Sequence, residues 1–265
     1  MIDTHAHLNF EDFVPDLKLV IGRAQKAGVK KIINIGSDWS TSREAIKLAG
    51  KFSGLFATIS LHPIHIEDEE FTLGKFRKLA QNPKVVAIGE TGLDYQEIQK
   101  SKVKMKNDRL ELKNKQRGVF EKLLDIATEL KKPVIIHCRE AEDEMIEILS
   151  NRKQQPYGVW HCFMKDWGLA RKILDLGFLI SFTGAITYNL SKKTKAAIEK
   201  IPLEKIMIET DCPFMTPLAQ RKQGIKRCEP AFVVEVAKKI AEIKNLSLAK
   251  VAKQTSQNAE KLFQI

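Results

Sequence analysis

The sequence begins with Met1-Ile2-Asp3-Thr4-His5-Ala6-His7, an apolar run with two histidines at alternate positions. The run predicts a β-strand, and side chains two residues apart on a strand point to the same face. His5 and His7 can therefore bind one metal ion together. A lone His-x-His pair also fits two hydrogen-bonded polar residues, so the rest of the chain has to decide between these interpretations.

Short apolar runs alternate with amphipathic segments along the whole chain. Eight runs predict strands over residues 2–7, 31–36, 55–62, 85–90, 133–138, 158–162, 178–182 and 206–211. Segments with helical spacing lie between them at residues 16–27, 42–51, 73–81, 115–131, 142–151, 167–176 and 192–201. This alternation predicts a parallel sheet covered by helices on both faces. A closed (β/α)8 barrel and an open doubly wound sheet both fit it.

Polar residues at the strand ends decide between the two architectures. Candidate ligands stand at the C-terminal ends of six predicted strands: His5, His7, His62, Glu90, His137, His161 and Asp211. In a barrel the first and last strands are neighbours, and all C-terminal ends meet at one mouth, where barrel active sites lie. We therefore predict an α/β fold, a single (β/α)8 TIM-barrel domain over residues 1–265, with C-terminal helices over 231–244 and 248–263.

Composition limits the class of protein. No apolar run reaches the roughly 20 residues that a membrane-spanning helix needs, and the first strand starts at Ile2, so we expect no membrane contact and no signal peptide. Lys and Arg total 44 against 33 Asp and Glu, a net charge of +11. This balance suits a nucleic acid substrate, although solvated lysine-rich helices would give the same number. We expect a cytoplasmic monomer or weak oligomer.

The four cysteines contain no Cys-x-x-Cys pair, which argues against a disulfide framework and a structural zinc knuckle. Cys138, Cys162 and Cys212 each follow a predicted ligand directly. Neighbouring residues on a strand face opposite ways. We therefore expect these thiols to face the helices, away from the ligands, and to act as small buried side chains like Cys228.

The predicted ligands exceed what one metal ion requires, because a catalytic zinc takes three protein ligands and keeps one open position. Two divalent cations that share a bridging carboxylate would use all six: His5, His7, Glu90, His137, His161 and Asp211. We predict Glu90 as the bridge, one cation with His5, His7 and Asp211, and the other with His137 and His161. Such a pair activates water and clamps the oxygens of a phosphoryl displacement. Mg²⁺, Mn²⁺ and Zn²⁺ all fit these donors.

Further residues are predicted to act on the substrate or on the ligands. Asp211 could orient the attacking water or accept its proton, and Glu90 is catalytic as the bridge. His62 ends the third strand and could bind a scissile phosphate or protonate a leaving oxygen. Glu209, Asp94 and Asp3 could orient ligands from a second layer, and they are weaker candidates.

Two basic segments leave from the predicted mouth. Residues 96–117 contain eight basic residues against three acidic ones, and residues 218–229 add four basic residues. We predict that Lys100, Lys102, Arg109 and Arg227 contact substrate phosphates. A solvated lysine-rich loop is the alternative for each of them.

Five motifs, in order, resemble the TatD family of metal-dependent deoxyribonucleases: residues 3–7 (DTHAH), 88–95 (IGETGLDY), 133–141 (PVIIHCREA), 161–163 (HCF) and 208–213 (IETDCP). The resemblance covers nearly the whole chain. It implies a (β/α)8 barrel of the amidohydrolase-like superfamily, the same six metal ligands with Glu90 shared, and 3′–5′ exonuclease activity on single-stranded DNA ends.

The chain departs from the family pattern at three places outside the ligands. Residues 164–166 (MKD) replace a small Ser/Thr-Gly pair, Cys228 replaces the Asn of Arg-Asn-Glu-Pro, and Gln96 replaces an aromatic residue. These departures concern substrate preference rather than the class of chemistry.

Other functions fit parts of the same pattern. A cyclic-amide hydrolase often bridges its metals with a carboxylated lysine on the fourth strand, where this chain has Glu90. A deacylase of D-aminoacyl-tRNA would use the basic rim equally well. A nucleic-acid-binding protein with a vestigial metal site is the third alternative, and the intact ligand set argues against it.

Overall fold

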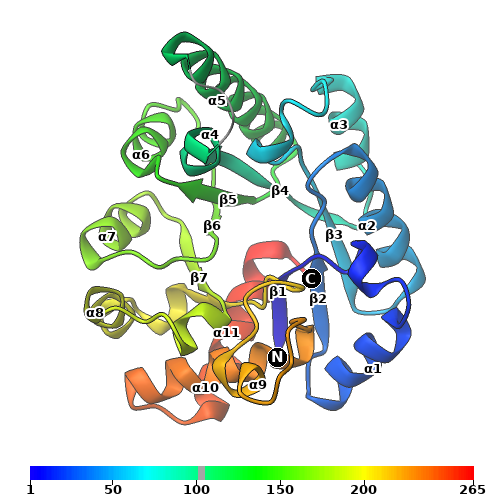
Figure 1. The fold of residues 1–265 in the computed structure, drawn as a ribbon, viewed down its shortest axis with the longest axis vertical. Helices are drawn as coiled ribbons and strands as arrows, with labels where there is room; N and C mark the ends of the chain where they lie inside the picture. The colour runs from blue at the N-terminus through cyan, green and yellow to red at the C-terminus, as the bar shows by residue number, and fades with distance from the viewer. Residues whose placement is uncertain (101–104) are drawn as a thin grey trace.

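The computed structural model describes residues 1–100 and 105–265, and its core is a ring of eight parallel strands (Figure 1). The strands follow one another in chain order: β1 (Ile2–Ala6), β2 (Lys31–Asn34), β3 (Leu55–Ile59), β4 (Val85–Asp94), β5 (Val134–Arg139), β6 (Gly158–Trp160), β7 (Leu179–Phe182) and β8 (Ile206–Ile208). The predicted (β/α)8 barrel is confirmed.

The ring closes between its first and last strands just where the first histidines lie. The Asp211 N–H donates to the His5 carbonyl at 2.8 Å, and the His7 N–H donates to the Cys212 carbonyl at 2.8 Å. Asp3 supports this seam, since its carboxylate accepts hydrogen bonds from the Thr210 N–H and hydroxyl at 2.9 and 2.6 Å. The N-terminal histidines and the β8 carboxylates therefore become neighbours.

The helices surround the barrel (Figure 1). They are α1 (Leu17–Lys26), α2 (Trp39–Lys51), α3 (Leu73–Ala80), α4 (Tyr95–Lys100), α5 (Lys106–Glu129), α6 (Glu142–Ser150), α7 (Trp167–Asp175), α8 (Lys192–Lys200), α9 (Leu218–Arg221), α10 (Val233–Lys244) and α11 (Leu248–Phe263). Several begin at residues whose side chains cap the free N–H groups, among them Asp38, Asp166, Ser191 and Ser247. No described helix has the length and apolar character that crossing a bilayer demands.

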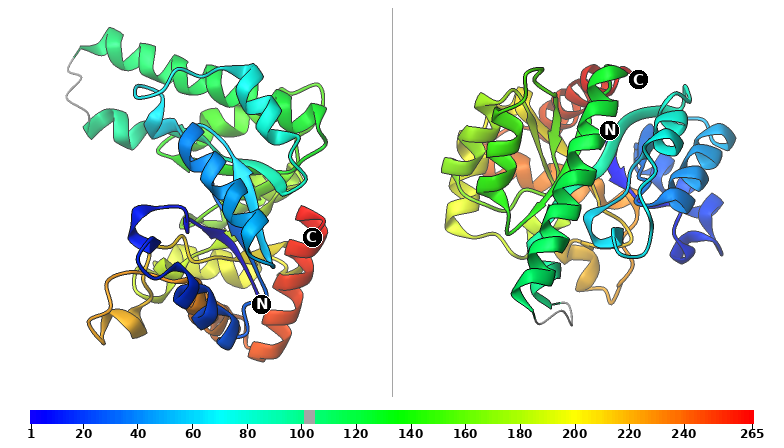
Figure 2. Two further views of the ribbon diagram at one scale, coloured as in Figure 1. Left: turned by 90° about the vertical axis from the view of Figure 1, so that its right-hand side faces the viewer. Right: turned by 90° about the horizontal axis from the view of Figure 1, so that it is seen from above.

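Two clusters of buried apolar side chains form the core. The larger one lies between the strands and the surrounding helices, as expected for strands that are buried on both faces. The smaller one gathers strand residues such as Ile33, Ile135 and Met207 with the end of α11. Figure 2 shows α11 at the end of the barrel opposite α4. One end is thus filled by apolar side chains, which leaves the other for polar chemistry.

The segments that follow β4 and β8 contain more helix than expected. Residues 96–114, for which no helix was predicted, belong to α4 and to the first part of α5, apart from Met105 and the undescribed residues 101–104. Residues 218–229 start with the short helix α9. A helix that consists largely of exposed charged residues is hard to predict from the sequence, because it lacks the apolar periodicity of an amphipathic helix.

A register shift on β4 turns Glu90 into the mouth. β4 has one residue more than β5 between Ile88 and Thr91. Ala87 belongs to the apolar cluster around α11, and Glu90, three residues later, lies among the polar residues of the mouth. Strict alternation would give residues three apart opposite directions, and the extra residue removes that conflict.

The first strand contains a similar register shift. Between Asp3 and Ala6, β1 has one residue more than β2. Ile2 packs in the cluster around α11, while His5 reaches the mouth three residues later. Both shifts stand at predicted ligands, where such irregularities re-aim a side chain.

Candidate metal centre

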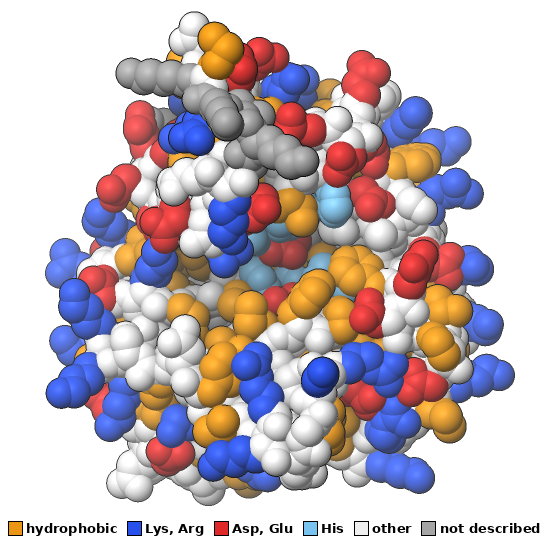
Figure 3. All heavy atoms as spheres, in the orientation of Figure 1, with side chains coloured by type: hydrophobic (Ala, Val, Ile, Leu, Met, Phe, Trp, Pro, Cys, Tyr) orange, Lys and Arg blue, Asp and Glu red, His pale blue; other side chains and the backbone are white. Residues whose placement is uncertain are grey.

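A hollow at the mouth of the barrel exposes histidine and carboxylate atoms at its floor (Figure 3). All six predicted ligands meet there, although they come from both ends of the sequence. The floor is largely shielded from water: His5 is fully buried and Glu90 is 5% exposed. Buried groups of this kind need charged or hydrogen-bonding partners, and they find them in one another.

One half of the cluster forms around one carboxylate oxygen of Glu90. The Nε2 atom of His5 lies 3.2 Å from Glu90 Oε2 and 3.6 Å from Asp211 Oδ1. The Nε2 atom of His7 lies 4.0 Å from Glu90 Oε2 and 3.4 Å from Asp211 Oδ1. The two Nε2 atoms are 3.3 Å apart. Two imidazoles and two carboxylates thus face a common point.

The other half forms around the second oxygen of Glu90. The Nδ1 atom of His137 lies 2.6 Å from Glu90 Oε1, and the Nε2 atoms of His161 and His62 each lie 3.4 Å from the same oxygen. The two carboxylate oxygens of Glu90 therefore serve two separate sets of imidazoles. This is the arrangement expected of a carboxylate shared by two cations.

The spacing of the donors fits divalent cations. Ligands held about 2.0–2.2 Å from one cation lie about 3 to 3.5 Å from each other. Most separations between imidazole nitrogens and carboxylate oxygens in the cluster fall in or near that range, at 3.2 to 3.6 Å. Imidazole and carboxylate donors also suit Zn²⁺ and Mn²⁺. The residues present therefore fit a metal centre.

A layer of carboxylates behind the cluster orients two of its imidazoles. His161 Nδ1 lies 2.8 Å from Glu209 Oε1, and His137 Nε2 lies 3.0 Å from Asp94 Oδ2. His137 donates its outer N–H to Asp94, and Glu209 forms an ion pair with the outer nitrogen of His161. In both residues the nitrogen that faces Glu90 can bind a metal once it is deprotonated. Glu209 and Asp94 hold the positions that sequence reasoning proposed only as weak candidates.

The protonation of the histidines follows from this crowding of carboxylates. Burial favours the neutral form of His161 and His137, but the pKa of His161 is raised to about 10, chiefly by Glu209 and Glu90. The pKa of His137 is raised to about 9 by hydrogen bonds to Asp94 and Glu90. Burial opposes ionisation of Glu90, yet the imidazoles of His161, His62 and His5 hold its pKa well below the usual value. Two imidazolium protons thus supply positive charge among the carboxylates.

His62 differs from the other histidines in its tautomer. Its Nδ1 atom accepts a hydrogen bond from the Ile64 N–H at 3.2 Å. Burial and the charge of His137 lower the pKa of His62 to about 4, so the ring is neutral at pH 7 and keeps its proton on Nε2. A metal ligand usually shows the opposite pattern, with the outer nitrogen as donor. His62 thus presents a hydrogen-bond donor to the cluster. Its place at the mouth was expected from the end of the third strand, whereas the direction of its N–H was not.

Cys162 was expected to face the helices, and this expectation is wrong. Its sulfur lies within 4.8 Å of ligand atoms of both His161 and Asp211. β6 ends at Trp160, and Cys162 has a φ of +50°, so the alternation of a paired strand no longer applies at this position. The thiol contacts the Thr183 hydroxyl at 3.4 Å.

Gly92 allows β5 to bring His137 close to β4. A Cβ atom at position 92 would lie 1.8 Å from the His137 carbonyl oxygen, and the φ of Gly92 is +151°. Only glycine adopts such a conformation without cost. The second glycine of the 88–95 motif therefore allows a ligand to be placed at the centre.

The four basic residues that were predicted to bind substrate phosphates have different surroundings. Lys100 ends α4 and lies 3.8 Å from Glu97, with its side chain 56% exposed. Arg109 lies half-buried on α5. Lys102 lies outside the described residues. Arg227 belongs to an ion-pair network described next, and the predicted phosphate contacts of all four stay predictions.

The network around Arg227 joins α1 to the segment before α10. Arg227 donates to both carboxylate oxygens of Asp16 at 2.8 Å and to Glu229 at 2.9 Å. Arg23 binds Glu229 at 2.7 and 2.9 Å and Asp16 at 2.9 Å. We refer to these four residues as the Arg227 network.

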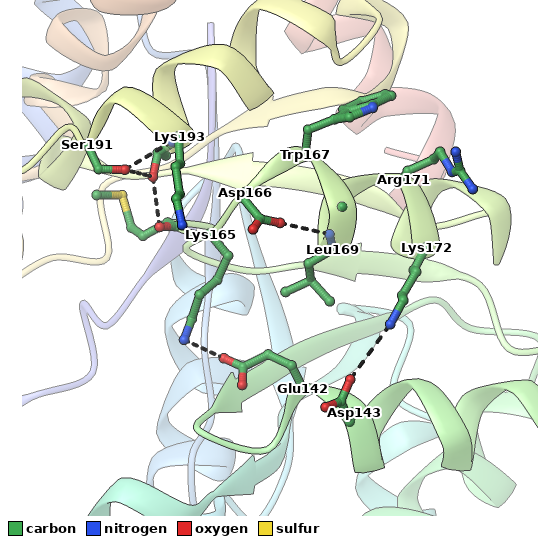
Figure 4. Close-up of a pocket in the computed structure, with 13 residues that line it drawn as sticks. Glu142, Asp143, Lys165, Asp166, Trp167, Leu169, Arg171, Lys172, Ser191 and Lys193 are labelled. Atoms are coloured by element: carbon green, nitrogen blue, oxygen red, sulfur yellow. Dashed lines mark hydrogen bonds and ion pairs between the residues drawn. The ribbon is translucent and has the colours of Figure 1, made fainter.

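A groove of about 800 Å³ opens beside the mouth, between the first turns of α6, α7 and α8 (Figure 4). The unusual residues Met164, Lys165 and Asp166 line it. Lys165 pairs with Glu142 at 2.8 Å, and Asp166 caps α7 by accepting the Leu169 N–H at 3.1 Å. The departure from the family pattern at residues 164–166 thus alters a groove next to the centre and leaves the ligands in place.

Comparison with known proteins agrees with this centre. The family model described as TatD related DNase matches residues 2–264. YabD of Bacillus subtilis strain 168, named an uncharacterized metal-dependent hydrolase, is 36% identical over 267 residues that cover 100% of this chain and 99% of that protein. YcfH of Escherichia coli K12, named in the same way, is 32% identical over 269 residues that cover 100% of this chain and 96% of that protein.

A solved structure gives the same result for the fold. The crystal structure of YJJV, a TatD homologue from Escherichia coli K12, matches with a TM-score of 0.86 and 28% identity, and the match covers 100% of this chain and 98% of that one. The family match spans almost the entire sequence, and the metal dependence named for the relatives agrees with the clustered imidazoles and carboxylates. The chain belongs to the TatD family of metal-dependent hydrolases.

Proposed function

We propose that this hydrolase is a deoxyribonuclease that uses two divalent cations and removes nucleotides from the 3′ end of single-stranded DNA. The observation that carries the proposal is the position of Glu90, whose two carboxylate oxygens each face a separate set of imidazoles. Two cations bound there would lower the pKa of a water molecule and neutralise the oxygens of a phosphodiester during hydrolysis.

The residues around the cations have separate tasks in this proposal. His5, His7, His137 and His161 hold the cations, with Glu90 between them. Asp211 stays ionised at neutral pH, because hydrogen bonding to His7 and the charge of His161 lower its pKa against the effect of burial. Its side chain is 12% exposed, against 6% for Glu90, so it faces the space where water enters. Asp211 is therefore placed to accept the proton of the attacking water.

His62 acts on the substrate in this proposal. Its neutral ring directs an N–H from Nε2 toward the centre, where it can donate to a non-bridging phosphate oxygen. A pKa of about 4 makes the imidazolium rare at pH 7. A role in protonating the leaving oxygen is therefore less well supported than phosphate binding.

The substrate class follows from charge and from the family. A net charge of +11 favours a polyanion, and we propose that Lys100, Lys102 and Arg109 guide its phosphates toward the mouth. Arg227 would contribute to the positive potential from within its network. All four cysteines are free thiols, which suits the cytoplasmic location that we propose.

A deacylase of D-aminoacyl-tRNA is the second candidate, because a basic rim would bind the acceptor strand of a tRNA as readily as DNA. The two candidates differ in the bond broken at the same centre. A nucleic-acid-binding protein with an inactive metal site is a third, and it predicts metal and DNA binding with no cleavage.

The test is digestion of a 5′-labelled single-stranded oligonucleotide with Mg²⁺, Mn²⁺ or Zn²⁺, with EDTA and the Asp211→Asn variant as controls. We expect a ladder of shortened products that requires both metal and Asp211. An intact oligonucleotide under every metal would overturn the proposal, and release of the amino acid from D-aminoacyl-tRNA would then support the deacylase. If the Asp211→Asn variant gave as much product as the wild type, the cleavage would come from a contaminating nuclease.

A further inference from the structure

Two aromatic side chains stand beside the metal centre without a role in binding the cations. Phe10 and Phe214 each follow a predicted ligand by three residues, and the backbone N–H of each donates to the carbonyl of that ligand. Phe10 N–H donates to His7 at 3.1 Å, and Phe214 N–H donates to Asp211 at 2.9 Å. The two rings are thus tied to the centre by its own ligands.

We propose that Phe10 and Phe214 form a stacking platform for the nucleobase next to the scissile phosphodiester, an inference that rests on the proposed nuclease function. The Phe10 ring stacks on the His7 ring with centroids 4.5 Å apart. The Phe214 ring stands 6.3 Å from both, inclined by 68° to His7 and 73° to Phe10. The three rings form an aromatic corner at one edge of the centre.

The exposed ring of Phe214 leaves an apolar surface beside the centre that a ligand could cover. Its side chain is 52% exposed, and among the described residues it is the only phenylalanine in the exposed class. Burial of an aromatic ring against another ring is favourable, so a ring left open beside a catalytic centre is available to the substrate. In Figure 3 hydrophobic side chains border one side of the hollow, and Lys and Arg side chains lie on the opposite side.

This arrangement matches the two chemical parts of a nucleotide. The phosphate would lie at the centre and face the cationic side, while the base would extend from the sugar toward the apolar side. Base-on-aromatic stacking is tolerant of sequence, because every base has a π face. In a duplex the terminal base already stacks and pairs, so a platform of this kind favours unpaired ends.

A second copy of this chain is the competing occupant, since Phe214 is one of several exposed apolar side chains that an interface between copies could cover. A partner seated on Phe214 would cover the entrance to the centre. The anchoring of both rings to ligand carbonyls favours the base instead.

The test compares oligonucleotides that differ only in the terminal base. One carries a normal 3′-terminal base and the other an abasic tetrahydrofuran residue, and both contain an uncleavable methylene phosphonate as the terminal linkage. Their affinities for the Mn²⁺-loaded protein are measured by fluorescence anisotropy. We expect the wild type to bind the base-bearing end about tenfold more tightly, the effect of one stacked base.

Three variants at one position separate stacking from simple apolar contact. Phe214→Ala and Phe214→Leu should lose the preference for the base, and Phe214→Trp should keep it. Leu248→Ala, which removes an exposed apolar side chain at the start of α11, is the matched control and should behave as wild type. Because Phe214 is exposed, we expect all variants to fold, and circular dichroism checks this.

The outcomes distinguish the platform from the proposed nuclease. Equal affinity of the wild type for both ends would overturn the platform, as would a Phe214→Leu variant that keeps the preference or a Phe214→Ala variant that weakens both ends equally. A change from dimer to monomer in Phe214→Ala, seen by gel filtration, would identify a second copy as the occupant and also overturn it. A clear base preference without cleavage of a normal oligonucleotide would support the platform and refute the nuclease.

Discussion

The metal centre and the cationic rim, by which we mean the basic residues of segments 96–117 and 218–229, are built in opposite ways. The centre takes its side chains from the ends of six strands, buries them and lets each carboxylate meet several imidazoles. The rim carries its charges on helices and loops, where many pair with a neighbour three or four residues away, as Lys115 does with Glu111. The residues of the centre meet because of their positions in the barrel, whereas the residues of the rim pair with neighbours that are close in the sequence.

This difference has energetic consequences. Interactions between buried charges are strong, and loss of one partner leaves the others unsatisfied. Exposed pairs are screened by water and salt, and most contribute little. Substitutions in the centre should therefore have large, specific effects, and those in the rim small effects that depend on ionic strength.

The largest effect is expected from Glu90→Gln. An amide cannot bridge two cations with two anionic oxygens, so hydrolysis should fall by at least about 10³-fold, and metal analysis of the purified protein should show less bound metal. The control is Glu97→Gln on the rim, half-exposed on α4, which should retain near-normal rates. A Glu90→Gln protein with wild-type metal content and turnover would refute the shared bridge.

A smaller effect is expected from Glu209→Gln. The amide oxygen can still accept the Cys162 N–H that Glu209 accepts at 2.9 Å, but the negative charge behind His161 is lost. Such outer partners change metal affinity by about 10- to 100-fold. Competition titration with a fluorescent chelator measures this change, with exposed Glu204→Gln as control. Equal affinities for the variant and the wild type would show that Glu209 only fills space.

Strand-end placement predicted which residues form the centre, because the C-terminal ends of parallel strands must meet in a barrel. The direction of each side chain was harder to foresee. Alternation holds from Val159 to His161 and from Met207 to Glu209, where the ligand or its outer partner is the first residue after the strand. It fails for Glu90, because the register shift that re-aims it depends on pairing with β5 and leaves no periodic signal in the sequence.

Residues beyond the strand ends show the same limit. Cys162 turns toward Asp211 because its backbone has left the strand. His62 lies 3.4 Å from Glu90 through the course of the loop after β3, and only its hydrogen bond from Ile64 N–H defines the tautomer. Three-dimensional pairing, rather than composition, decides these details. The contacts of the rim residues could not be predicted from the sequence either, since a lysine in a basic segment gives no sign of its partner.

The Arg227 network offers a third test, in which pH separates the rim from the centre. Hydrogen bonds from Arg227 and Arg23 lower the pKa of Asp16 to about 2, below the value of about 3.9 in an unfolded chain. The stability that Asp16 provides is therefore present above pH 4 and is lost as the pH falls through 2. Asp16 makes no capping hydrogen bond to α1, so substitution reports on the ion pairs.

Asp16→Asn should lower the urea midpoint at pH 5 and approach the wild-type midpoint near pH 2. The change in free energy of unfolding should be at most about 1 kcal/mol, since the network is partly open to solvent. Glu44→Gln, which removes an exposed pair with Lys47 on α2, should leave the midpoint unchanged. A difference between Asp16→Asn and wild type that is independent of pH would contradict the ionic origin.

The smallest effect is expected from the rim lysine and arginine that we propose as phosphate contacts. Each contact to single-stranded DNA releases counterions and contributes about −0.7 to the slope of log K against log salt. Lys100→Ala and Arg109→Ala should each reduce the slope by that amount and weaken binding only a few-fold at low salt. Lys253→Ala is the control, since this exposed residue lies on α11, at the closed end of the barrel.

Arg227→Ala sharpens the same measurement, because Asp16 and Glu229 already neutralise its guanidinium. If the rim acts through free positive charge, Arg227→Ala should change the salt slope less than Lys100→Ala and lower stability more. A slope that stays unchanged in Lys100→Ala and Arg109→Ala would mean that these residues do not contact phosphate. If only Arg227→Ala changed the salt slope strongly, the Arg227 network would have to open when substrate binds. Arg227 would then contact phosphate in spite of its ion pairs with Asp16 and Glu229.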